Sequence, residues 1–320
     1  MVDAMPDVGC AGILVEDTFC GPLAVIPGEG TLLALEDIPV RAGGCASNVA
    51  IDLAGQGVSV EVCGCVGDDA AAMVIVNALI RHEVGASRIV RVPHHATSKT
   101  VILLIEGEDR RYLHMAGANR AFSVSHVPIA WTSRLKVFYL GGLFALPGID
   151  FTELAALLKT FRTSGVITVV DVALPADLTG MTALRELLPH VDYFVPNDDE
   201  ARAFTGVTDT RDQLEAFKSA GGRTVIITCG EHGAVAAHEN RVYRCGAYAM
   251  KVVDPSGSGD AFTSGVIRGL LKKWDLPRTL RYASAVGASA TRAAGCTDAV
   301  FTGPEAEAFV AEHPLAVAEV

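Results

Sequence analysis

Short apolar runs alternate with longer helical segments along the chain from about Val124 onward. Two helix starts are readable, because Asp150 and Thr302 are each followed three residues later by a glutamate, a pattern typical of a capped helix. Strands that alternate with helices are typical of parallel βαβ units, so we predict an α/β fold around a mostly parallel sheet. The apolar runs predict strands at Val137–Leu140, Val166–Asp171, Tyr193–Val195 and Val225–Thr228.

Each predicted strand ends in polar or glycine residues, namely Gly141-Gly142, Asp171, Asn197 and Gly230. In an open α/β sheet, ligands bind in the crevice at the carboxyl ends of the strands. The pattern therefore predicts a binding site at this edge of the sheet.

The first third of the chain has a different pattern, with two stretches, about 17–40 and 97–115, that predict short strands joined by turns. Val101–Ile105, the turn Glu106-Gly-Glu-Asp109 and Arg110–Met115 together predict a β-hairpin. A small sheet at the edge of a parallel core would serve as a lid over the strand ends. The sequence has no internal repeat or linker, so we predict one domain over residues 1–320 with lid strands from these two stretches.

Composition and charge narrow the class of protein. Half of the 320 residues are hydrophobic and one fifth are charged, which excludes a disordered chain. The net charge of −11 argues against nucleic acid as a partner. The eight cysteines lie mostly among apolar or small residues, as buried reduced thiols do, and there is neither a leader pattern at the N-terminus nor an apolar run long enough to span a membrane. We therefore expect a cytoplasmic protein that does not bind membranes.

The segment Val253–Phe262 carries the strongest chemical signal. Three small residues, Gly257, Ser258 and Gly259, stand directly before a predicted helix, where backbone N–H groups and the helix dipole favour an anion. A carboxylate such as Asp260 would repel a phosphate, but it would serve as a base for a hydroxyl that attacks the phosphorus. The structural alternative is a glycine-rich loop in which Asp260 caps the helix.

Two further motifs follow predicted strands. Asn197-Asp-Asp-Glu200 offers an amide and a carboxylate suited to hydrated Mg²⁺ beside a nucleotide's phosphates, although a helix cap explains it equally well. The glycines of Thr228-Cys-Gly230-Glu-His-Gly233 would let the backbone approach phosphate or ribose, and the alternative is a hairpin turn.

Near the N-terminus, Gly43 and Gly44 precede Asn48 at the start of a predicted helix. These glycines would admit a polyol whose hydroxyls are bound by Asn48 and Asp17, and a helix cap at Ser47 is the alternative. Neither a Walker A sequence nor a Gly-x-Gly-x-x-Gly after the first strand is present.

Taken together and in this order, these motifs resemble the ribokinase family of sugar kinases, also called the PfkB family. The resemblance implies a three-layer α/β/α fold with a β lid, and transfer of the γ-phosphoryl group of ATP, with Mg²⁺, to a hydroxymethyl group. The motifs that carry it are Gly43-Gly44 with Asn48, Gly64–Asp68, Gly117-Ala118-Asn119, Asn197 with Glu200, Thr228–Gly233 and Asp254–Asp260.

The resemblance also implies a role for each matching residue. Asp260 is the expected base, and the amides of Gly257, Ser258 and Gly259 form the anion hole. The nucleotide is expected at Asn197, Thr228, Gly230, Gly233 and Ser284, with Mg²⁺ held by Glu200 through water. The sugar is expected at Asp17, Gly43, Gly44, Asn48 and Asn119, and a monovalent cation such as K⁺ at Asp254 and Ser256.

Three departures from the family pattern bear on cation and substrate. Pro255 removes a backbone donor beside the expected cation site, which leaves K⁺ dependence open. Asp171-Val-Ala-Leu-Pro175 lacks the asparagine and arginine that several sugar kinases have there, so different phosphate contacts are expected. Tyr139–Leu143 lacks the acidic residue that ribokinases use near the sugar, so ribose is not the default substrate.

The sequence leaves two other kinase functions, a non-catalytic function and the formation of a dimer open. A nucleoside kinase would use the same phosphate site, and Phe19 and Tyr112 are the aromatic residues that the lid offers a base. A sugar-phosphate kinase would need basic groups, which Arg41, Arg110, Arg111 and Arg120 supply. A ligand-binding regulator without turnover would not need Asp260. The exposed edges of a lid sheet also favour a homodimer through the lids.

Overall fold

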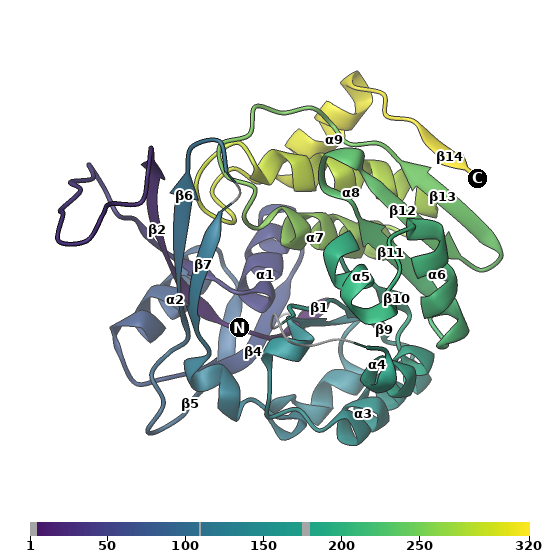
Figure 1. Ribbon diagram of the computed structural model, residues 1–320. Helices are drawn as coiled ribbons and strands as arrows, with labels where there is room; N and C mark the ends of the chain where they lie inside the picture. Colours follow the sequence, from purple (N-terminus) through teal and green to yellow (C-terminus); the bar gives the residue numbers. More distant parts are fainter. Residues whose placement is uncertain (1–4, 109, 175–179) are drawn as a thin grey trace.

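The computed structural model describes residues 5–108, 110–174 and 180–320. Asp109 of the predicted turn, Pro175 and the first four residues of the predicted domain lie outside the described residues. A large twisted sheet runs through the molecule with helices packed on both sides (Figure 1). The predicted three-layer α/β/α arrangement is confirmed.

Ten strands form the large sheet within the described ranges, in the order β14-β13-β12-β11-β10-β9-β8-β1-β4-β5. The pairings from β5 to β11 are parallel, and β12, β13 and β14 add an antiparallel edge that the sequence analysis did not predict. The strands are β1 (Val8–Gly12), β4 (Val60–Val66), β5 (Gly85–Arg91), β8 (Val137–Gly141), β9 (Ile167–Val170), β10 (Tyr193–Phe194), β11 (Thr224–Thr228), β12 (Ala234–His238), β13 (Arg241–Cys245) and β14 (Val317–Glu319).

The helices cover the two faces of this sheet because its central strands are apolar on both sides. In β8, Phe138 and Leu140 belong to one core, whereas Val137 and Tyr139 belong to the other. One face is covered by α3 (Phe151–Thr163), α4 (Thr182–Leu187), α5 (Asp198–Thr205) and α6 (Thr210–Ser219). The other is covered by α1 (Cys45–Gly55), α2 (Ala70–Arg81), α7 (Ser258–Leu271) and α8 (Leu276–Ala290), with α9 (Gly303–Glu312) packed on α8.

The two predicted helix starts are confirmed, whereas the predicted position of the first parallel strands is wrong. Asp150 accepts a hydrogen bond from the Glu153 amide at 2.9 Å, and Thr302 and Glu305 form a capping box. The sequence analysis placed the parallel units from Val124 onward, but β1, β4 and β5 belong to the same parallel sheet. The lid strands β2 and β3 come between β1 and helix α1, so strands and helices do not alternate in this part of the chain.

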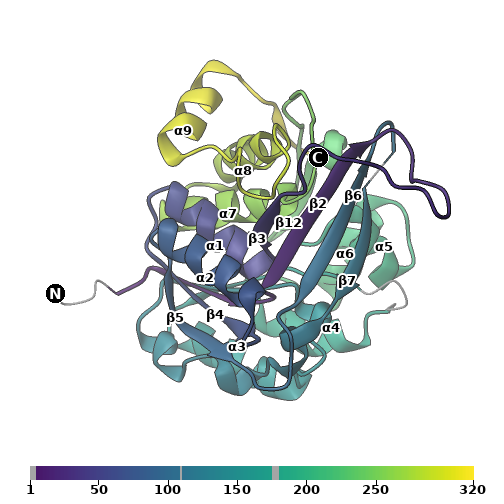
Figure 2. The same cartoon turned by 90° about the vertical axis from the view of Figure 1, so that its left-hand side faces the viewer.

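A second, four-stranded sheet stands over the carboxyl ends of the large sheet (Figure 2). It consists of β2 (Val15–Leu23), β3 (Val40–Gly43), β6 (Lys99–Ile105) and β7 (Arg111–Met115), in the order β3-β2-β6-β7. The predicted hairpin is present as the antiparallel pair β6 and β7, in which Lys99 lies opposite Met115. Strands β6 and β7 lie in the second predicted stretch, 97–115, whereas β2 begins two residues before the first, 17–40, and β3 extends three residues beyond it.

Short 3₁₀ helices complete the described chain: η1 (Gly117–Ala121), η2 (Val124–His126), η3 (Ile129–Ser133), η4 (Leu143–Ala145), η5 (Leu188–His190) and η6 (Gly230–His232). None of the helices in the described ranges has the length and apolar character that a membrane crossing requires.

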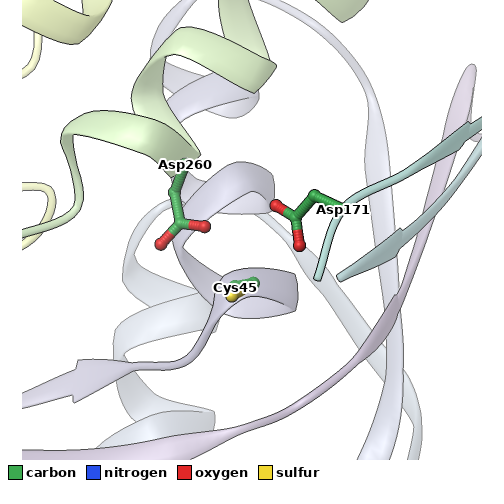
Figure 3. A group of neighbouring side chains, drawn as sticks. All are labelled: Cys45, Asp171 and Asp260. Atoms are coloured by element: carbon green, nitrogen blue, oxygen red, sulfur yellow. The ribbon is translucent and has the colours of Figure 1, made fainter. Parts of the chain in front are cut away.

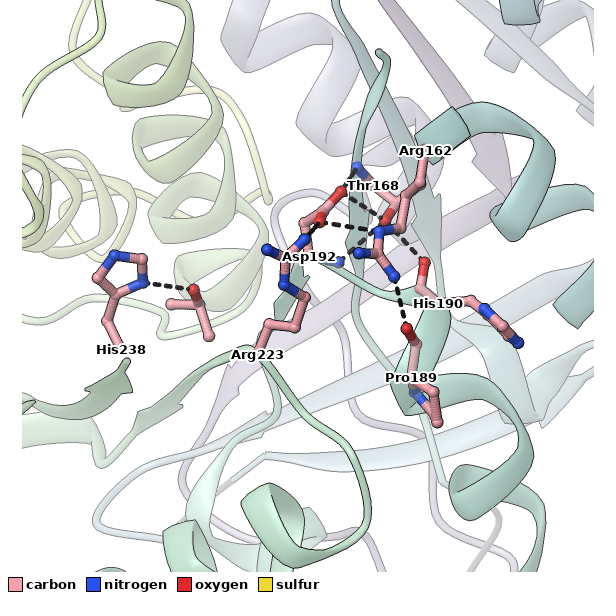
Figure 4. A network of polar contacts seen from close by, with 8 residues as sticks. Arg162, Thr168, Pro189, His190, Asp192, Arg223 and His238 are labelled. Carbon is pink, nitrogen blue, oxygen red and sulfur yellow. Dashed lines mark hydrogen bonds and ion pairs between the residues drawn. The ribbon is translucent and has the colours of Figure 1, made fainter. Parts of the chain in front are cut away.

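The amino ends of β9, β10 and β11, which lie opposite the lid, carry a polar network beside a cavity of about 700 Å³ (Figure 4). Asp192 accepts hydrogen bonds from the Thr168 amide at 3.0 Å and from Arg223 at 2.9 Å, and its ion pair with Arg162 measures 3.1 Å. These contacts join the starts of β9, β10 and β11. The two arginines of this cavity thus share one carboxylate, and we assign the network a structural role.

Candidate active site

A cavity of about 870 Å³ lies between the lid and the carboxyl ends of the large sheet. It is lined by residues that are far apart in the chain, from lid strands, from the start of α1 and from the start of α7. Most of the predicted site residues meet here: Asp17, Gly44, Asn48, Asn197, Glu200, Thr228, Ser256, Gly257, Ser258, Gly259 and Asp260.

Gly43 and Asn119 support the cavity wall rather than line it. A Cβ atom at Gly43 would overlap the Asp17 carboxylate, so only glycine allows this close approach. Asn119 is buried, and its amide exchanges two hydrogen bonds with the backbone of Leu14, at 3.2 and 3.1 Å. Both polar atoms of Asn119 thus bind the backbone at the junction of β1 and β2, and its predicted sugar contact stays a prediction.

The predicted nucleotide residues divide between the cavity and its surroundings. Gly230 and Gly233 lie in the turn that joins β11 to the antiparallel strand β12, so the hairpin alternative describes their backbone. The Ser284 hydroxyl donates to the Gly246 carbonyl at 3.1 Å. Asn197 and Glu200 form a capping box at the start of α5, with both bonds at 2.8 Å, and their side chains still line the cavity.

The start of α7 is directed into the cavity. Gly257 adopts a left-handed conformation with φ of 78°, and a Cβ atom there would collide with the backbone of Cys296. A Cβ atom at Gly259 would meet open space. The helix begins at Ser258, whose amide makes a 3.3 Å turn contact with the Pro255 carbonyl. The amides of a first helical turn lack partners within the helix, so this end of α7 offers donors and a positive dipole to an anion.

Asp260 stands in this first turn without capping it, because Gly257 is the N-cap residue and no side chain caps the helix. Its Oδ2 atom accepts a hydrogen bond from Nδ2 of Asn48 at 2.8 Å. Burial raises the pKa of Asp260 above its ordinary value, whereas the hydrogen bonds from Asn48 and the Cys45 thiol lower it. The carboxyl group is therefore a half-buried, oriented acid whose proton affinity is higher than that of a surface aspartate.

Cys45 and Asp171 lie beside Asp260 (Figure 3), with one ligand-type atom of each within 4.8 Å of the others. Asp171 accepts hydrogen bonds from the Tyr139 hydroxyl at 2.5 Å and the Gly142 amide at 2.9 Å. Burial and the charge of Asp260 hold the pKa of Asp171 well above its usual range. Because their polar atoms are bound to protein partners, we interpret the three residues as an acid pair with a thiol rather than as a metal centre.

Sequence reasoning identified Asp171 as a strand end but gave no role to Cys45 or Tyr139. Cys45 stands within the glycine segment that precedes Asn48, and Tyr139 lies one residue before the predicted strand end. Apolar surroundings in the sequence made both look like core residues. Only the fold brings them to the acid pair.

Two more acids have raised pKa values around the cavity. Asp17 on β2 is 6% exposed, and burial raises its pKa to about 7. The Cys296 sulfur lies 3.7 Å from its Oδ2 atom as a thiol donor. Burial also raises the pKa of Glu200 to about 7, and the charge of Asp260 adds to the increase. Hard carboxylate oxygens that repel one another suit a divalent cation such as Mg²⁺.

The predicted monovalent-cation residues lie just beneath the start of α7. Asp254 is fully buried and accepts hydrogen bonds from the amides of Ser256, at 2.9 Å, and Gly295, at 3.3 Å. The Ser256 hydroxyl is buried and has no hydrogen-bond partner within the described ranges. An oxygen with this environment is suited to a ligand that supplies positive charge.

The fold and this site define a class: a three-layer α/β/α protein with a β lid closing over an acid-lined cavity. The family model described as pfkB family carbohydrate kinase matches residues 13–302, and the chain therefore belongs to this family.

Known proteins similar to the chain agree with this assignment. Ribokinase from Haemophilus influenzae is 26% identical over 300 residues, which cover 91% of this chain and 94% of that protein. ATP-dependent 6-phosphofructokinase from Thermoanaerobacterium thermosaccharolyticum is 34% identical over 116 residues, 36% of each chain. The structure of Arabidopsis thaliana ribokinase complexed with ribose and ATP superimposes with a TM-score of 0.80 at 20% identity, covering 96% of this chain and 99% of that one.

Proposed function

We propose that the protein is an ATP-dependent kinase that transfers the γ-phosphoryl group of MgATP to a hydroxymethyl group of a small carbohydrate. The observation that carries the proposal is the position of Asp260, a half-buried carboxyl group in the first turn of α7, in the lid-covered cavity. A base and an anion site meet there, as phosphoryl transfer to an alcohol requires.

In this mechanism Asp260 accepts the proton of the acceptor hydroxyl as the hydroxyl oxygen attacks the γ-phosphorus. The bond from the γ-phosphorus to the oxygen that joins it to the β-phosphate breaks, and ADP leaves. Asn48 orients the Asp260 carboxylate. The amides of Gly257, Ser258 and Gly259 donate to the oxygens of the transferred group, whose charge grows in the transition state. Closure of the lid excludes water, which is a competing nucleophile.

The nucleotide would lie along the edge of the sheet beside Asn197 and Thr228, with Gly230, Gly233 and Ser284 in the surrounding wall. Glu200 and Asn197 would hold Mg²⁺ through water molecules. When bound there, Mg²⁺ would offset the negative charge of the phosphate groups. The acidic wall of the cavity fits such a cation.

The acceptor would lie under the lid, where Asp17 and Asn48 offer a carboxylate and an amide to sugar hydroxyls. Gly43 allows the Asp17 carboxylate to approach the chain before α1, Gly44 packs against the backbone of Ile13, and Asn119 holds Leu14 at the base of the lid.

A sugar phosphate is the second candidate acceptor, because Arg110 and Arg120 line the lid side of the same cavity. Guanidinium groups bind phosphate with paired hydrogen bonds, so they would position a second phosphate away from Asp260. Similarity to a 6-phosphofructokinase over about a third of the chain supports including this class in a substrate screen.

A monovalent cation is proposed at Asp254 and Ser256. The buried Ser256 hydroxyl and the Asp254 carboxylate would hold K⁺ beneath the anion hole. Turnover in K⁺ that exceeds turnover in an equal concentration of a bulky cation such as tetramethylammonium is the expected result.

The experiment that tests the proposal is ADP release across a panel of sugars, sugar phosphates and nucleosides with Mg²⁺ present. The expected result is strong ADP release with one class of acceptor, lost in Asp260→Asn. Silence across the panel with ATP bound would contradict the proposal and favour a ligand-binding regulator.

A further inference from the structure

Two polar stripes face each other where α1 packs on α7. Asn48, Asp52 and Gln56 stand one helical turn apart on α1, and Asp260 and Ser264 have the same spacing on α7. Asn48 donates to Asp260 at 2.8 Å, and the Gln56 amide donates to the Ser264 hydroxyl at 2.8 Å. The side chains at the two ends of the α1 stripe are therefore bound across the helix pair.

Asp52 occupies the middle of this stripe without a partner. It is 3% exposed, and neither of its carboxyl oxygens has a hydrogen-bond partner within the described ranges. An ionised carboxylate in that environment would be strongly destabilising, because nothing replaces its lost hydration. Burial, reinforced by the charge of Asp260, holds the pKa of Asp52 well above its usual range.

The Oδ1 atom of Asn48 is the matching acceptor. It is also buried without a hydrogen-bond partner among the described residues, and it belongs to the residue one turn before Asp52 on the same face of α1. Side chains four residues apart on a helix are close enough to interact. A protonated carboxyl group has one donor, and this amide oxygen needs one.

We propose that Asp52 is a positioning residue that donates a hydrogen bond, as a neutral carboxylic acid, to Oδ1 of Asn48 and so keeps the Asn48 N–H group on Asp260. The inference rests on the proposed function, because Asp260 is the base in that reaction. With its oxygen fixed, the Asn48 amide cannot turn over and present that oxygen to the carboxylate. The chain Asp52–Asn48–Asp260 thus links a buried acid to the base through one amide.

The contact from Asp52 is also expected to affect the pKa of the base, Asp260. The Asn48 bond favours ionised Asp260, so loss of the Asp52 donor raises the pKa of Asp260. The other titratable groups around Asp260, which stay in place in every variant below, are Asp17 of β2, Cys45 of α1, Tyr139 of β8, Asp171 after β9, Glu200 of α5 and Cys296 after α8.

Unfolding experiments test the inference without any substrate. If Asp52 is protonated in the folded state, the unfolding constant of the wild type relative to Asp52→Asn rises about tenfold per pH unit between roughly pH 5 and 7. In a double-mutant cycle, Asp52→Ala and Asn48→Ala are expected to couple by about three- to tenfold in the unfolding constant. Parallel pH curves or additive effects would overturn the proposal.

Kinetics then separate positioning from stability. For Asp52→Ala we expect the acid limb of the pH profile of kcat/KM to move to higher pH. We also expect turnover to fall about tenfold, because one hydrogen bond that orients the base is lost. Asp52→Asn should restore both, because its amide also donates. Gln213→Ala on α6 is the matched control, since it removes another buried amide with an unpartnered oxygen and should leave the acid limb in place.

The outcomes are distinguishable. An acid limb that moves to lower pH in Asp52→Asn would show an ionised Asp52 and contradict the inference. A wild type with no kinase activity would instead contradict the proposed function, and the unfolding experiments would still decide the state of Asp52.

Discussion

At the scale of single residues, Asp17 and Asp260 are both acids that line the cavity, but the cavity gives them different neighbours. Asp260 lies at the positive end of α7 with amide and thiol donors, whereas Asp17 comes from the lid and faces the expected sugar position. The account therefore assigns proton transfer to Asp260 and acceptor binding to Asp17.

Asp17→Asn tests this division. Loss of a charged hydrogen bond to a sugar hydroxyl is expected to lower kcat/KM for the acceptor by about 10- to 100-fold, with the Kd of ATP unchanged. Steady-state kinetics with the acceptor identified by the panel provide the measurement. Glu16→Gln is a matched control, because Glu16 is the neighbouring acid on β2 and is ion-paired with Lys99 at 3.0 Å. An equal loss in the control would contradict the assignment.

The sequence also has limits at this scale. Asn119 belongs to a recognisable motif, but only the structure shows that its amide is occupied by Leu14. Asp52 carried no signal because an aspartate in a predicted helix is ordinarily a solvent-exposed residue. Its burial depends on α7, which lies more than 200 residues further along the chain.

At the scale of elements, the start of α7 is the feature on which the anion site depends. Its sequence signature was sufficient to predict it, because small residues before a helix act locally. Gly257 is required there for two reasons, its left-handed backbone and its contact with Cys296.

Gly257→Ala is therefore expected to lower the free energy of unfolding by at least about 2 kcal/mol, through the left-handed conformation and the collision. Urea-induced unfolding measures the change. Gly259→Ala is the control for stability, since a Cβ atom there meets open space. Equal stability of Gly257→Ala and the wild type would show that the loop adopts another conformation.

An element could be predicted where its own sequence carries a local pattern. The β6–β7 hairpin and the strands from β8 to β11 were predicted, because alternation or apolar runs with turn residues mark them locally. The antiparallel edge of β12, β13 and β14 was not. Its hairpins β11–β12 and β12–β13 are local, and the hairpin alternative for Thr228–Gly233 described the first of them, whereas β14 pairs with β13 across a long stretch of chain. The parallel pair of β1 and β4 was missed because the lid strands β2 and β3 separate β1 from α1 in the chain.

At the scale of the whole molecule, five acids with raised pKa values crowd the lid-covered half: Asp17, Asp52 and Asp171 are buried, and Glu200 and Asp260 are half-buried. Burial raises the pKa values of Asp17 and Glu200 to about 7, and those of Asp52, Asp171 and Asp260 are also raised. A raised folded-state pKa means that the folded protein binds more protons than the unfolded chain, so stability is lost as pH rises.

We therefore expect the free energy of unfolding without Mg²⁺ to fall from about pH 5 to 7, by roughly 1.4 kcal/mol per pH unit for each acid that stays protonated. Urea unfolding at several pH values measures this slope, and Mg²⁺ is expected to restore part of the loss at pH 7. Stability that rises through this window would contradict the raised pKa values.

The lid supports the proposal of a symmetric dimer. Strand β7 is exposed along its whole length, including Leu113 at 66%, and the loop 24–39 beside the lid exposes Leu32 at 90% (Figure 1). An open strand edge with apolar side chains favours pairing with another copy. Sedimentation at micromolar concentration is expected to give a dimer that Leu113→Lys weakens, and a monomer throughout would refute the pairing.

The central claim is that Asp260 is the base in phosphoryl transfer. Its most direct test is single-turnover transfer from ATP to the identified acceptor by Asp260→Asn, alongside ATP affinity. The account predicts transfer slowed by about two to four orders of magnitude, the range typical of general-base loss, with ATP affinity nearly unchanged. Transfer at the wild-type rate would remove Asp260 from the mechanism.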